Sequence, residues 1–314
     1  MLNRRLLRIK VLQIVYAHTF SKEKPVFESE KELLFSVGKS HELYLLIIEL
    51  LTDIAHQAKL KAELIENREV TDRSDAIKYN RIAENLLIKA ISTNREFKAR
   101  IKHSGQTWND NITLVKDYLN QVFESSFFNR YIDNSEKSFA QDKKLALHII
   151  SDIIPLSESL FNYLEDKSIY WNDDVDFILE MVYKTIKNIN ENDAQSFEVL
   201  SPFSNDADKD FGIVLLRKCI VDYDKYSTII EKQLDNWQLD RVADIDLLLI
   251  KMAIIEAVEF TSIPLKVTLN EYIEIAKYYS TENSGTFING LIDRIYKQLV
   301  TDKVIIKTGR GLID

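Results

Sequence analysis

Three arginines near the start of the chain, Arg4, Arg5 and Arg8, are the residues whose types and spacing best suit anion binding. In "RRLLRIKVLQIVY", residues 4–16, apolar residues recur at helical spacing, which predicts a helix with the arginines in its first two turns. Their side chains would project over an arc of about 100°, and guanidinium groups bind phosphate in a bidentate manner. Positive charge in a first turn opposes the helix dipole. The segment alone leaves two interpretations open: a phosphate clamp or a solvated helix end.

No other set of residues indicates catalysis or a metal site. The sequence lacks a P-loop, a dinucleotide-binding glycine motif and a nucleophile elbow. Its five histidines are scattered, and the single cysteine, Cys219, excludes an internal disulfide framework and a cysteine-based zinc site. The acidic run "NDDVD", residues 172–176, lacks the glycine of a calcium loop and is predicted to begin a helix. We therefore expect no enzyme, no metal and no cofactor.

The composition favours an all-α protein. The 314 residues include seven glycines and four prolines, far fewer than usual, and no run of strict apolar alternation predicts a sheet. The longest apolar stretches are short and carry a charge, so no transmembrane span is predicted. The first ten residues lack the apolar core of a signal peptide. These features predict a soluble, cytoplasmic helical protein without a membrane partner.

Charge is distributed unevenly along the chain. The net charge is −8, yet residues 1–22 carry five basic side chains and no acidic one. Residues 121–210 carry 8 basic and 18 acidic side chains. The middle of the chain would repel phosphate, whereas its N-terminal end would attract it. Any site for a polyanion is therefore predicted to be confined to a small part of the protein surface.

The stretch "ENSGTFINGLIDRI", residues 282–295, combines a helical pattern with an unexpected glycine. Phe287, Leu291 and Ile295 repeat every four residues, which predicts an amphipathic helix that begins near Ser284. Gly290 lies inside it, and a glycine in a helix interior costs about 1 kcal/mol relative to alanine. The missing side chain would allow another backbone or a nucleotide to approach closely.

Several motifs occur in the order typical of one known family. They are "DIDLLLIKMAIIE" (244–256), "IPLKVTLNEYIEIAKYYS" (263–280), S-x-x-F-I-N-G-L-I-D (284–293) and, near the start, R-x-x-x-L-Q-x-V-Y (8–16). Together these segments resemble the NusB family of transcription antitermination factors. The resemblance covers residues 1–20 and about 207–300.

The resemblance implies a fold of two small helical bundles, no catalysis, and binding to the boxA element of ribosomal-RNA leader transcripts. It implies partnership with the ribosomal protein NusE within the transcription elongation complex. Residue-by-residue matching gives eight expected RNA-binding or surface-edge positions: Arg4, Arg5, Arg8, Tyr16, Asp246, Lys251, Phe287 and Asn289. An aromatic ring can stack on an unpaired base, and an amide can read a base edge. Core packing is the alternative interpretation of Phe287.

The chain departs from the family pattern in length. We expect a NusB-like domain at residues 1–20 and 207–302, an inserted helical region at 21–206 and a tail at 303–314. Apolar periodicity predicts further helices at residues 40–65, 76–92, 112–127, 143–166 and 173–189, with polar breaks at 93–111 and 190–208. Residues 164–179 also resemble residues 234–249 at a shift of 70, so the insertion is a candidate degenerate repeat.

Two functions from different classes remain open at this stage. The first is an antitermination factor that binds boxA-type single-stranded RNA with NusE. The second is a protein–protein scaffold with a NusB-like fold and weakened RNA binding, because Asn283 and Thr286 replace residues that are commonly charged in the family. A clamp formed by the arginines predicts that Arg8→Glu weakens RNA binding by roughly 2 kcal/mol without loss of thermal stability.

Overall fold

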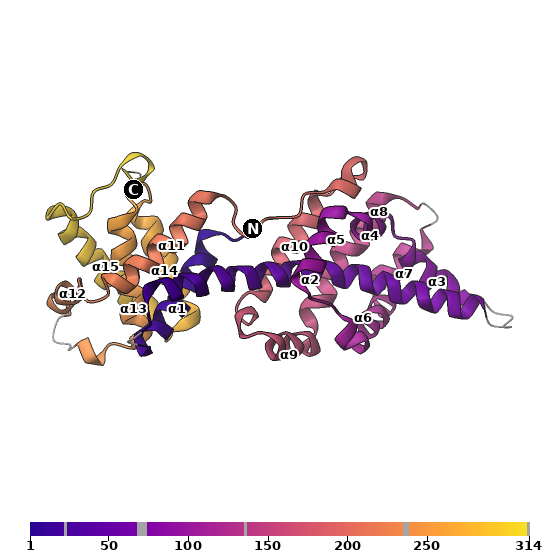
Figure 1. Cartoon of the computed structure of the whole chain (residues 1–314), viewed down its shortest axis with the longest axis horizontal. Coiled ribbons are helices and arrows are strands. Elements are labelled where there is room, and N and C mark those ends of the chain that lie inside the picture. The colour runs from indigo at the N-terminus through magenta and orange to yellow at the C-terminus, as the bar shows by residue number, and fades with distance from the viewer. Residues whose placement is uncertain (22–23, 68–73, 135–136, 235–238, 313–314) are drawn as a thin grey trace. The chain divides into compact units, whose positions relative to one another are not determined.

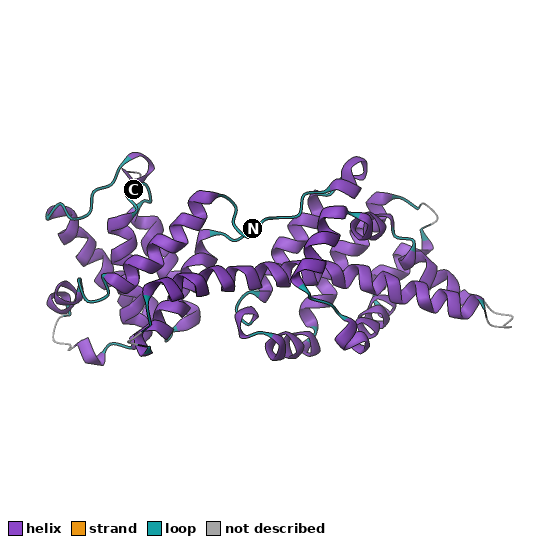
Figure 2. Ribbon diagram, in the orientation of Figure 1, coloured by secondary structure: helices purple, strands orange, loops and turns teal. Residues whose placement is uncertain are grey.

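The computed structural model describes residues 1–21, 24–67, 74–134, 137–234 and 239–312. Within these ranges the chain is helical and forms no strand, as Figure 2 shows. A single isolated parallel bridge joins Leu2 to Phe203. The all-α prediction is therefore confirmed.

The chain divides into two compact units. The terminal unit contains residues 2–37 and the chain from residue 203 onward, and the central unit contains residues 38–202 and Met1. Helix α2 (Val26–Glu66) contributes residues to both units. The predicted insertion began at residue 21, whereas residues 21–37 group here with the terminal unit. Whether residues 21–206 constitute an insertion into a NusB-like domain stays a prediction.

The terminal unit is built around helix α13, which is apolar on nearly every side. Its helices, shown in Figure 1, are α1 (Arg4–Phe20), the start of α2, α11 (Asp206–Val221), α12 (Ser227–Gln233), α13 (Asp244–Glu259), α14 (Leu265–Tyr279) and α15 (Ser284–Thr301). Helix α13 packs against α1, α11, α14 and α15. A helix that is hydrophobic all round must be buried, and the continuous run from Leu248 to Ala257 is indeed buried.

Helix α1 begins at a side-chain cap. The Asn3 side chain accepts a hydrogen bond from the Leu6 backbone N–H at 2.9 Å, which satisfies one of the unpaired donors of the first turn. The first turn holds no acidic residue. Its buried face includes Leu7, Val11 and Val15 and packs on α11 and α13. The helix is thus held by packing, while its first turn carries charges that oppose the dipole.

Helix α15 starts at the predicted residue. Ser284 is its first residue, and the Ser284 Oγ lies 3.2 Å from the Thr281 backbone nitrogen, which donates to it. Ile288, Leu291 and Ile295 are buried on one face. The apolar period of four residues therefore predicted both the start and the packing face of this helix.

In its described residues the central unit contains the remainder of α2, eight shorter α-helices and a π-helical turn, together with short 3-10 turns. These helices are α3 (Ser74–Ala83), α4 (Leu86–Thr93), α5 (Arg95–Ser104), α6 (Ile112–Glu124), α7 (Ser126–Asp133), α8 (Phe139–His148), a π-helical turn (Ile149–Ile153), α9 (Glu158–Lys167) and α10 (Val175–Asn188). Two buried tryptophans donate to carbonyl groups of α2. Trp108 Nε1 donates to Leu46 O at 2.8 Å, and Trp171 Nε1 donates to Lys39 O at 2.7 Å. These bonds satisfy polar groups that burial would otherwise leave unpaired.

Three sequence-based predictions for the central unit were wrong in their boundaries. The predicted helix 76–92 is two helices because Asn85 caps a new start, where its side chain accepts from the Ile88 N–H at 3.0 Å. The predicted helix 143–166 is interrupted near Pro155, and Ser157 caps α9. The predicted polar break 93–111 contains helix α5, which begins after the cap residue Asn94. In the first two cases a capping side chain begins a new helix inside an apolar period, and in the third it begins a helix inside a polar segment.

Two stretches of the chain share part of their element order. A helix, a 3-10 turn and a further helix occur as α9, Ile169–Trp171 and α10, and again as α12, Leu239–Arg241 and α13, whereas the π-helical and 3-10 turns between α8 and α9 have no counterpart between α11 and α12. The two 3-10 turns are 70 residues apart, which is the shift at which the sequences resemble each other. The agreement supports the hypothesis of a degenerate repeat.

Candidate nucleic-acid interface

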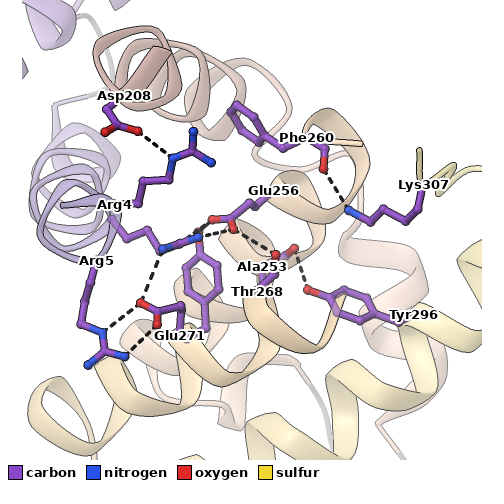
Figure 3. A network of polar contacts seen from close by, with 12 residues as sticks. Arg4, Arg5, Asp208, Ala253, Glu256, Phe260, Thr268, Glu271, Tyr296 and Lys307 are labelled. Atoms are coloured by element: carbon purple, nitrogen blue, oxygen red, sulfur yellow. Dashed lines mark hydrogen bonds and ion pairs between the residues drawn. The ribbon is translucent and has the colours of Figure 1, made fainter. Parts of the chain in front are cut away.

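Arg8 is buried in the terminal unit and forms a bidentate ion pair with Glu256. Arg8 Nη2 lies 2.6 Å from Glu256 Oε1, and Nε lies 2.8 Å from Oε2 (Figure 3). The Arg8 side chain is 3% exposed and that of Glu256 0%. Burial alone would lower the guanidinium pKa, but the hydrogen bonds and charge of Glu256 outweigh it and raise the pKa. Arg8 therefore stays charged inside the helical core.

Two further donors complete the surroundings of Glu256. Thr268 Oγ1 donates to Oε1 at 3.0 Å, and Tyr272 Oη donates to Oε2 at 3.0 Å. Both donors belong to α14, so the network ties α1, α13 and α14 together. A buried charge is tolerated when it is paired and hydrogen-bonded in this way.

The structure weighs against a phosphate-clamp role for Arg8, although its RNA-binding role stays a prediction. Its guanidinium points into the unit, where a carboxylate already occupies the bidentate position that a phosphate would take. The sequence did not reveal this because the partner lies 248 residues away on another helix. Because Arg8→Glu would bury two carboxylates together, we now expect this variant to lose thermal stability rather than to retain it.

Arg4 and Arg5 lie nearer the surface, and each pairs with a carboxylate. Arg4 Nε donates to Asp208 Oδ1 at 2.8 Å, and Arg5 donates to both oxygens of Glu271 at 2.7 and 2.9 Å (Figure 3). The arginine side chains are 40% and 49% exposed. The hydrogen bonds from Arg5 lower the pKa of the Glu271 carboxyl. These partially exposed pairs are open to competition from an anion in solution.

The arginines border a shallow surface depression of about 360 Å³. Its lining residues come from the start of α1 and from the beginning of α14: Asn3, Arg4, Arg5, Arg8, Ile263, Val267 and Glu271. The three carboxylates on the arginines explain why α1 tolerates positive charge in its first turn, since they offset the unfavourable interaction with the dipole. The depression is therefore less positive than the sequence indicated.

Tyr16 lies further along α1 and belongs to a pair of exposed rings. Its side chain is 37% exposed, and that of Phe20, one turn later, is 69% exposed. The ring centroids are 5.0 Å apart with an interplanar angle of 66°. Exposed aromatic faces of this kind can stack on unpaired bases. Phe20 was missed by the sequence analysis, although its i, i+4 spacing from Tyr16 was a usable signal.

The residues that begin α15 lie partly at the surface. Phe287 is half-buried, while Asn289 and Gly290 are exposed. A Cβ atom built on Gly290 would meet no atom within 4 Å. No other described helix of this chain therefore packs closely against Gly290. The approach of a nucleotide stays the open interpretation.

Asp246 and Lys251 are buried on α13, so the expectation of an exposed position was an error, while their role at the RNA surface stays a prediction. Asp246 Oδ2 accepts a hydrogen bond from Ser284 Oγ at 2.8 Å, which joins the starts of α13 and α15. Lys251 Nζ lies 3.6 Å from the centre of the Tyr223 ring and 3.5 Å from Asp224 Oδ1. Burial lowers the Lys251 pKa. The error arose because α13 is buried on almost all sides rather than along one stripe.

Three carboxylates that define the site were not predicted from the sequence: Asp208, Glu256 and Glu271. Glu256 carried one signal, since it is the lone acid inside the apolar run 247–257 and a buried acid needs a cation or hydrogen-bond donors. Glu271 lies within the segment that carries the family resemblance. Asp208 is an ordinary first-turn acid of α11, and no local pattern links it to Arg4.

The described part of the chain holds neither a metal-site geometry nor a membrane-spanning helix. No group of three or more His, Cys, Asp or Glu side chains within the described ranges has the geometry of a metal site. No helix among the same residues is long and apolar enough to span a membrane. The candidate site is therefore a surface of arginines, carboxylates and aromatic rings on an all-helical scaffold.

Comparison with known proteins shows that the chain belongs to the NusB family. The family model matches residues 190–297. A protein of Salinibacter ruber named transcription antitermination protein NusB is 41% identical over 140 residues, which cover 43% of this chain and 88% of the relative. Proteins with the same name from Chloroherpeton thalassium and Thermodesulfovibrio yellowstonii are 42% and 41% identical and are covered over 50% and 60% of their lengths. No solved structure matches the chain at the same level of significance.

Proposed function

We propose that this protein acts in transcription antitermination by binding boxA-type single-stranded RNA together with the ribosomal protein NusE, in support of ribosomal RNA transcription. The three relatives described above are named transcription antitermination protein NusB. The observation that carries the proposal is the surface of α1, where Arg4 and Arg5 lie at one end and the exposed Tyr16 at the other.

This surface suits an unpaired RNA strand. A helix of 17 residues rises about 1.5 Å per residue, so residues 5 and 16 are separated by roughly three turns, a span of a few nucleotides. Tyr16 stacks on a base, while the half-exposed arginines exchange their carboxylate partners for backbone phosphates. Asn289, exposed on α15, supplies an amide for a base edge.

The central unit is not expected to contact RNA. It holds 20 basic and 27 acidic side chains, against 21 and 22 in the terminal unit. An acidic surface repels phosphate at moderate ionic strength. Its role in the proposal is to contact a protein of the elongation complex.

A direct binding experiment tests the function. The full chain, with and without NusE, is titrated into a labelled boxA RNA and into a scrambled RNA of equal length, and anisotropy is followed. Preferential binding to boxA that NusE strengthens is the expected result. NusE binding without any preference for boxA would instead favour the scaffold function, which the pairing of Arg4, Arg5 and Arg8 with carboxylates supports.

A further inference from the structure

The C-terminal segment after α15 is anchored to the loop that joins α13 to α14. The Thr308 N–H donates to Thr261 O at 3.0 Å, and the two threonine hydroxyl groups lie 3.0 Å apart. Lys307 Nζ donates to Phe260 O at 3.0 Å (Figure 3). The segment then closes into a short 3-10 turn, Gly309–Leu312.

Two of the seven glycines in the chain are required by this turn. Gly309 adopts a left-handed conformation, with φ 55°. Gly311 is buried, and a Cβ atom there would lie 2.0 Å from Thr261 O, which is an impossible contact with backbone. A chain that otherwise uses little glycine therefore places two around Arg310 in a geometry that only glycine permits.

The anchoring loop also borders the arginine depression. Ile263 of this loop lines the depression together with Arg4 and Arg5. The Phe260 ring packs against Phe211 with centroids 4.7 Å apart, and the Arg4 guanidinium lies over Phe211 at 5.1 Å. A continuous set of contacts thus connects the first turn of α1 to the C-terminal turn.

Arg310 differs from the arginines of α1 in its charge environment. Its side chain is exposed, and among the described residues no carboxylate lies within ion-pair distance of it. Arg4, Arg5 and Arg8 each have such a partner. An exposed guanidinium on an ordered turn loses little conformational freedom on binding, and within the described ranges it has no carboxylate to displace.

We propose that Arg310 binds a backbone phosphate of the RNA strand that contacts α1, so that the C-terminal turn extends the RNA-binding surface. This inference rests on the proposed function. The turn positions the guanidinium, and the glycines make that position possible. The contact is to phosphate and therefore adds affinity without reading sequence.

The experiment measures boxA RNA binding by the full chain in complex with NusE over a series of salt concentrations. Arg310→Ala should weaken binding by about 3–10-fold and make the slope of log affinity against log salt shallower by roughly 0.7, the value for one phosphate contact on a single strand. The matched control is Arg241→Ala, an exposed arginine on another 3-10 turn of the terminal unit, which should bind like the parent. Melting temperatures of both variants should equal that of the parent.

A second variant tests the positioning role of the turn. Gly311→Ala places a Cβ atom where Thr261 O lies, so the turn must leave its site. Its RNA affinity should fall to the level of Arg310→Ala, and the double variant should be no weaker than either single one. If proteolysis shows that the C-terminal segment of Gly311→Ala is released, yet this variant binds RNA like the parent, the turn does not position Arg310.

The outcomes separate the two proposals. If the parent and Arg310→Ala bind boxA RNA with equal affinity, the inference about Arg310 is overturned, but the proposed function is not. Equal losses in Arg310→Ala and Arg241→Ala also overturn it, because the effect would then be one of general charge. A parent protein without RNA binding overturns both.

Discussion

The guanidinium of Arg8 and the carboxylate of Glu256 meet at 2.6 Å inside the terminal unit, although 248 residues separate them in the sequence. This pair joins the N-terminal helix to the C-terminal third of the chain. Together with the pairs Arg4–Asp208 and Arg5–Glu271, it explains how the first helix can carry three arginines without an acid in its first turn. Arg8, one of the arginines of the most positive segment of the sequence, therefore serves to stabilise the fold.

Replacing Arg8 by Met should destabilise the terminal unit strongly. Glu256 would keep its two hydroxyl donors but lose its counter-charge, and breaking a buried pair in this way costs about 3–5 kcal/mol. Chemical denaturation followed by circular dichroism measures the change. Arg5→Met is the matched control, because its half-exposed pair contributes about 1 kcal/mol or less. Equal stability of the two variants would show that the Arg8 pair is not the buried network described above.

Glu271→Gln should strengthen RNA binding. The substitution removes the carboxylate that occupies Arg5, and it leaves an amide of similar shape. We expect a several-fold gain in affinity and a steeper salt dependence, because a freed guanidinium contacts one more phosphate. Glu274→Gln on the same helix is the control. An unchanged affinity in Glu271→Gln would mean that Arg5 does not reach the RNA.

Glu271 also gives an expectation for acid stability. Arg5 lowers the pKa of this carboxyl in the folded state, so the pair contributes stability above the usual carboxyl pKa of about 4.3 and loses it as the pH falls through the lowered value. The free energy of unfolding of the parent should therefore fall more steeply below that pH than the free energy of Glu271→Gln. Parallel curves for the two proteins would contradict this linkage.

Gly290→Ala should stabilise the protein and weaken RNA binding. The added methyl group meets open space, and alanine is favoured over glycine in a helix interior by about 0.8–1 kcal/mol. If a nucleotide of the proposed RNA packs against the exposed Gly290, the added methyl group would obstruct it. Gly285→Ala, where the Cβ would lie 3.6 Å from Ile273, is the control for RNA binding. Undiminished RNA affinity in a stabilised Gly290→Ala protein would remove Gly290 from the interface.

Asp53→Asn should stabilise the protein at neutral pH but not in acid. Burial raises the pKa of the Asp53 carboxyl to about 6, so the folded state disfavours its charged form, and stability is lost as the pH rises from about 4 to about 6. Because the side chain is only partly buried, solvent screening reduces the expected gain to about 1 kcal/mol. Thermal melts at pH 4 and pH 7.5 measure it, with Glu63→Gln, exposed on the same helix, as control. A gain that is the same at both pH values would contradict the linkage.

The fold class and several element boundaries could be predicted because they depend on local patterns. The apolar period of α15 gave its first residue, Ser284, and scarce glycine and proline gave the all-α class. Errors occurred where a short polar side chain starts a new helix inside a periodic segment. Asn85 and Asn94 do so in the central unit, and each accepts a hydrogen bond from a backbone N–H.

The candidate site was harder to predict because its character depends on contacts between distant segments. Arg4, Arg5 and Tyr16 are at or near the surface, as a helical projection indicates. The same projection cannot show that Arg8 pairs with Glu256 in the core, or that Thr308 bonds to Thr261. Phe287, for which stacking and packing were both open, is half-buried, so both interpretations remain compatible with its position.

The lone thiol gives this chain a built-in reporter. Cys219 on α11 is fully buried, and burial raises its pKa well above the usual value, with a further increase from the nearby Glu256. A thiol-specific reagent can therefore react only when this part of the terminal unit opens. Since the central unit contains no cysteine, the rate of labelling of the unmodified protein measures opening of one unit alone. Saturating RNA should slow that labelling, which makes reagent protection a ligand assay that needs neither a fluorophore nor a substitution.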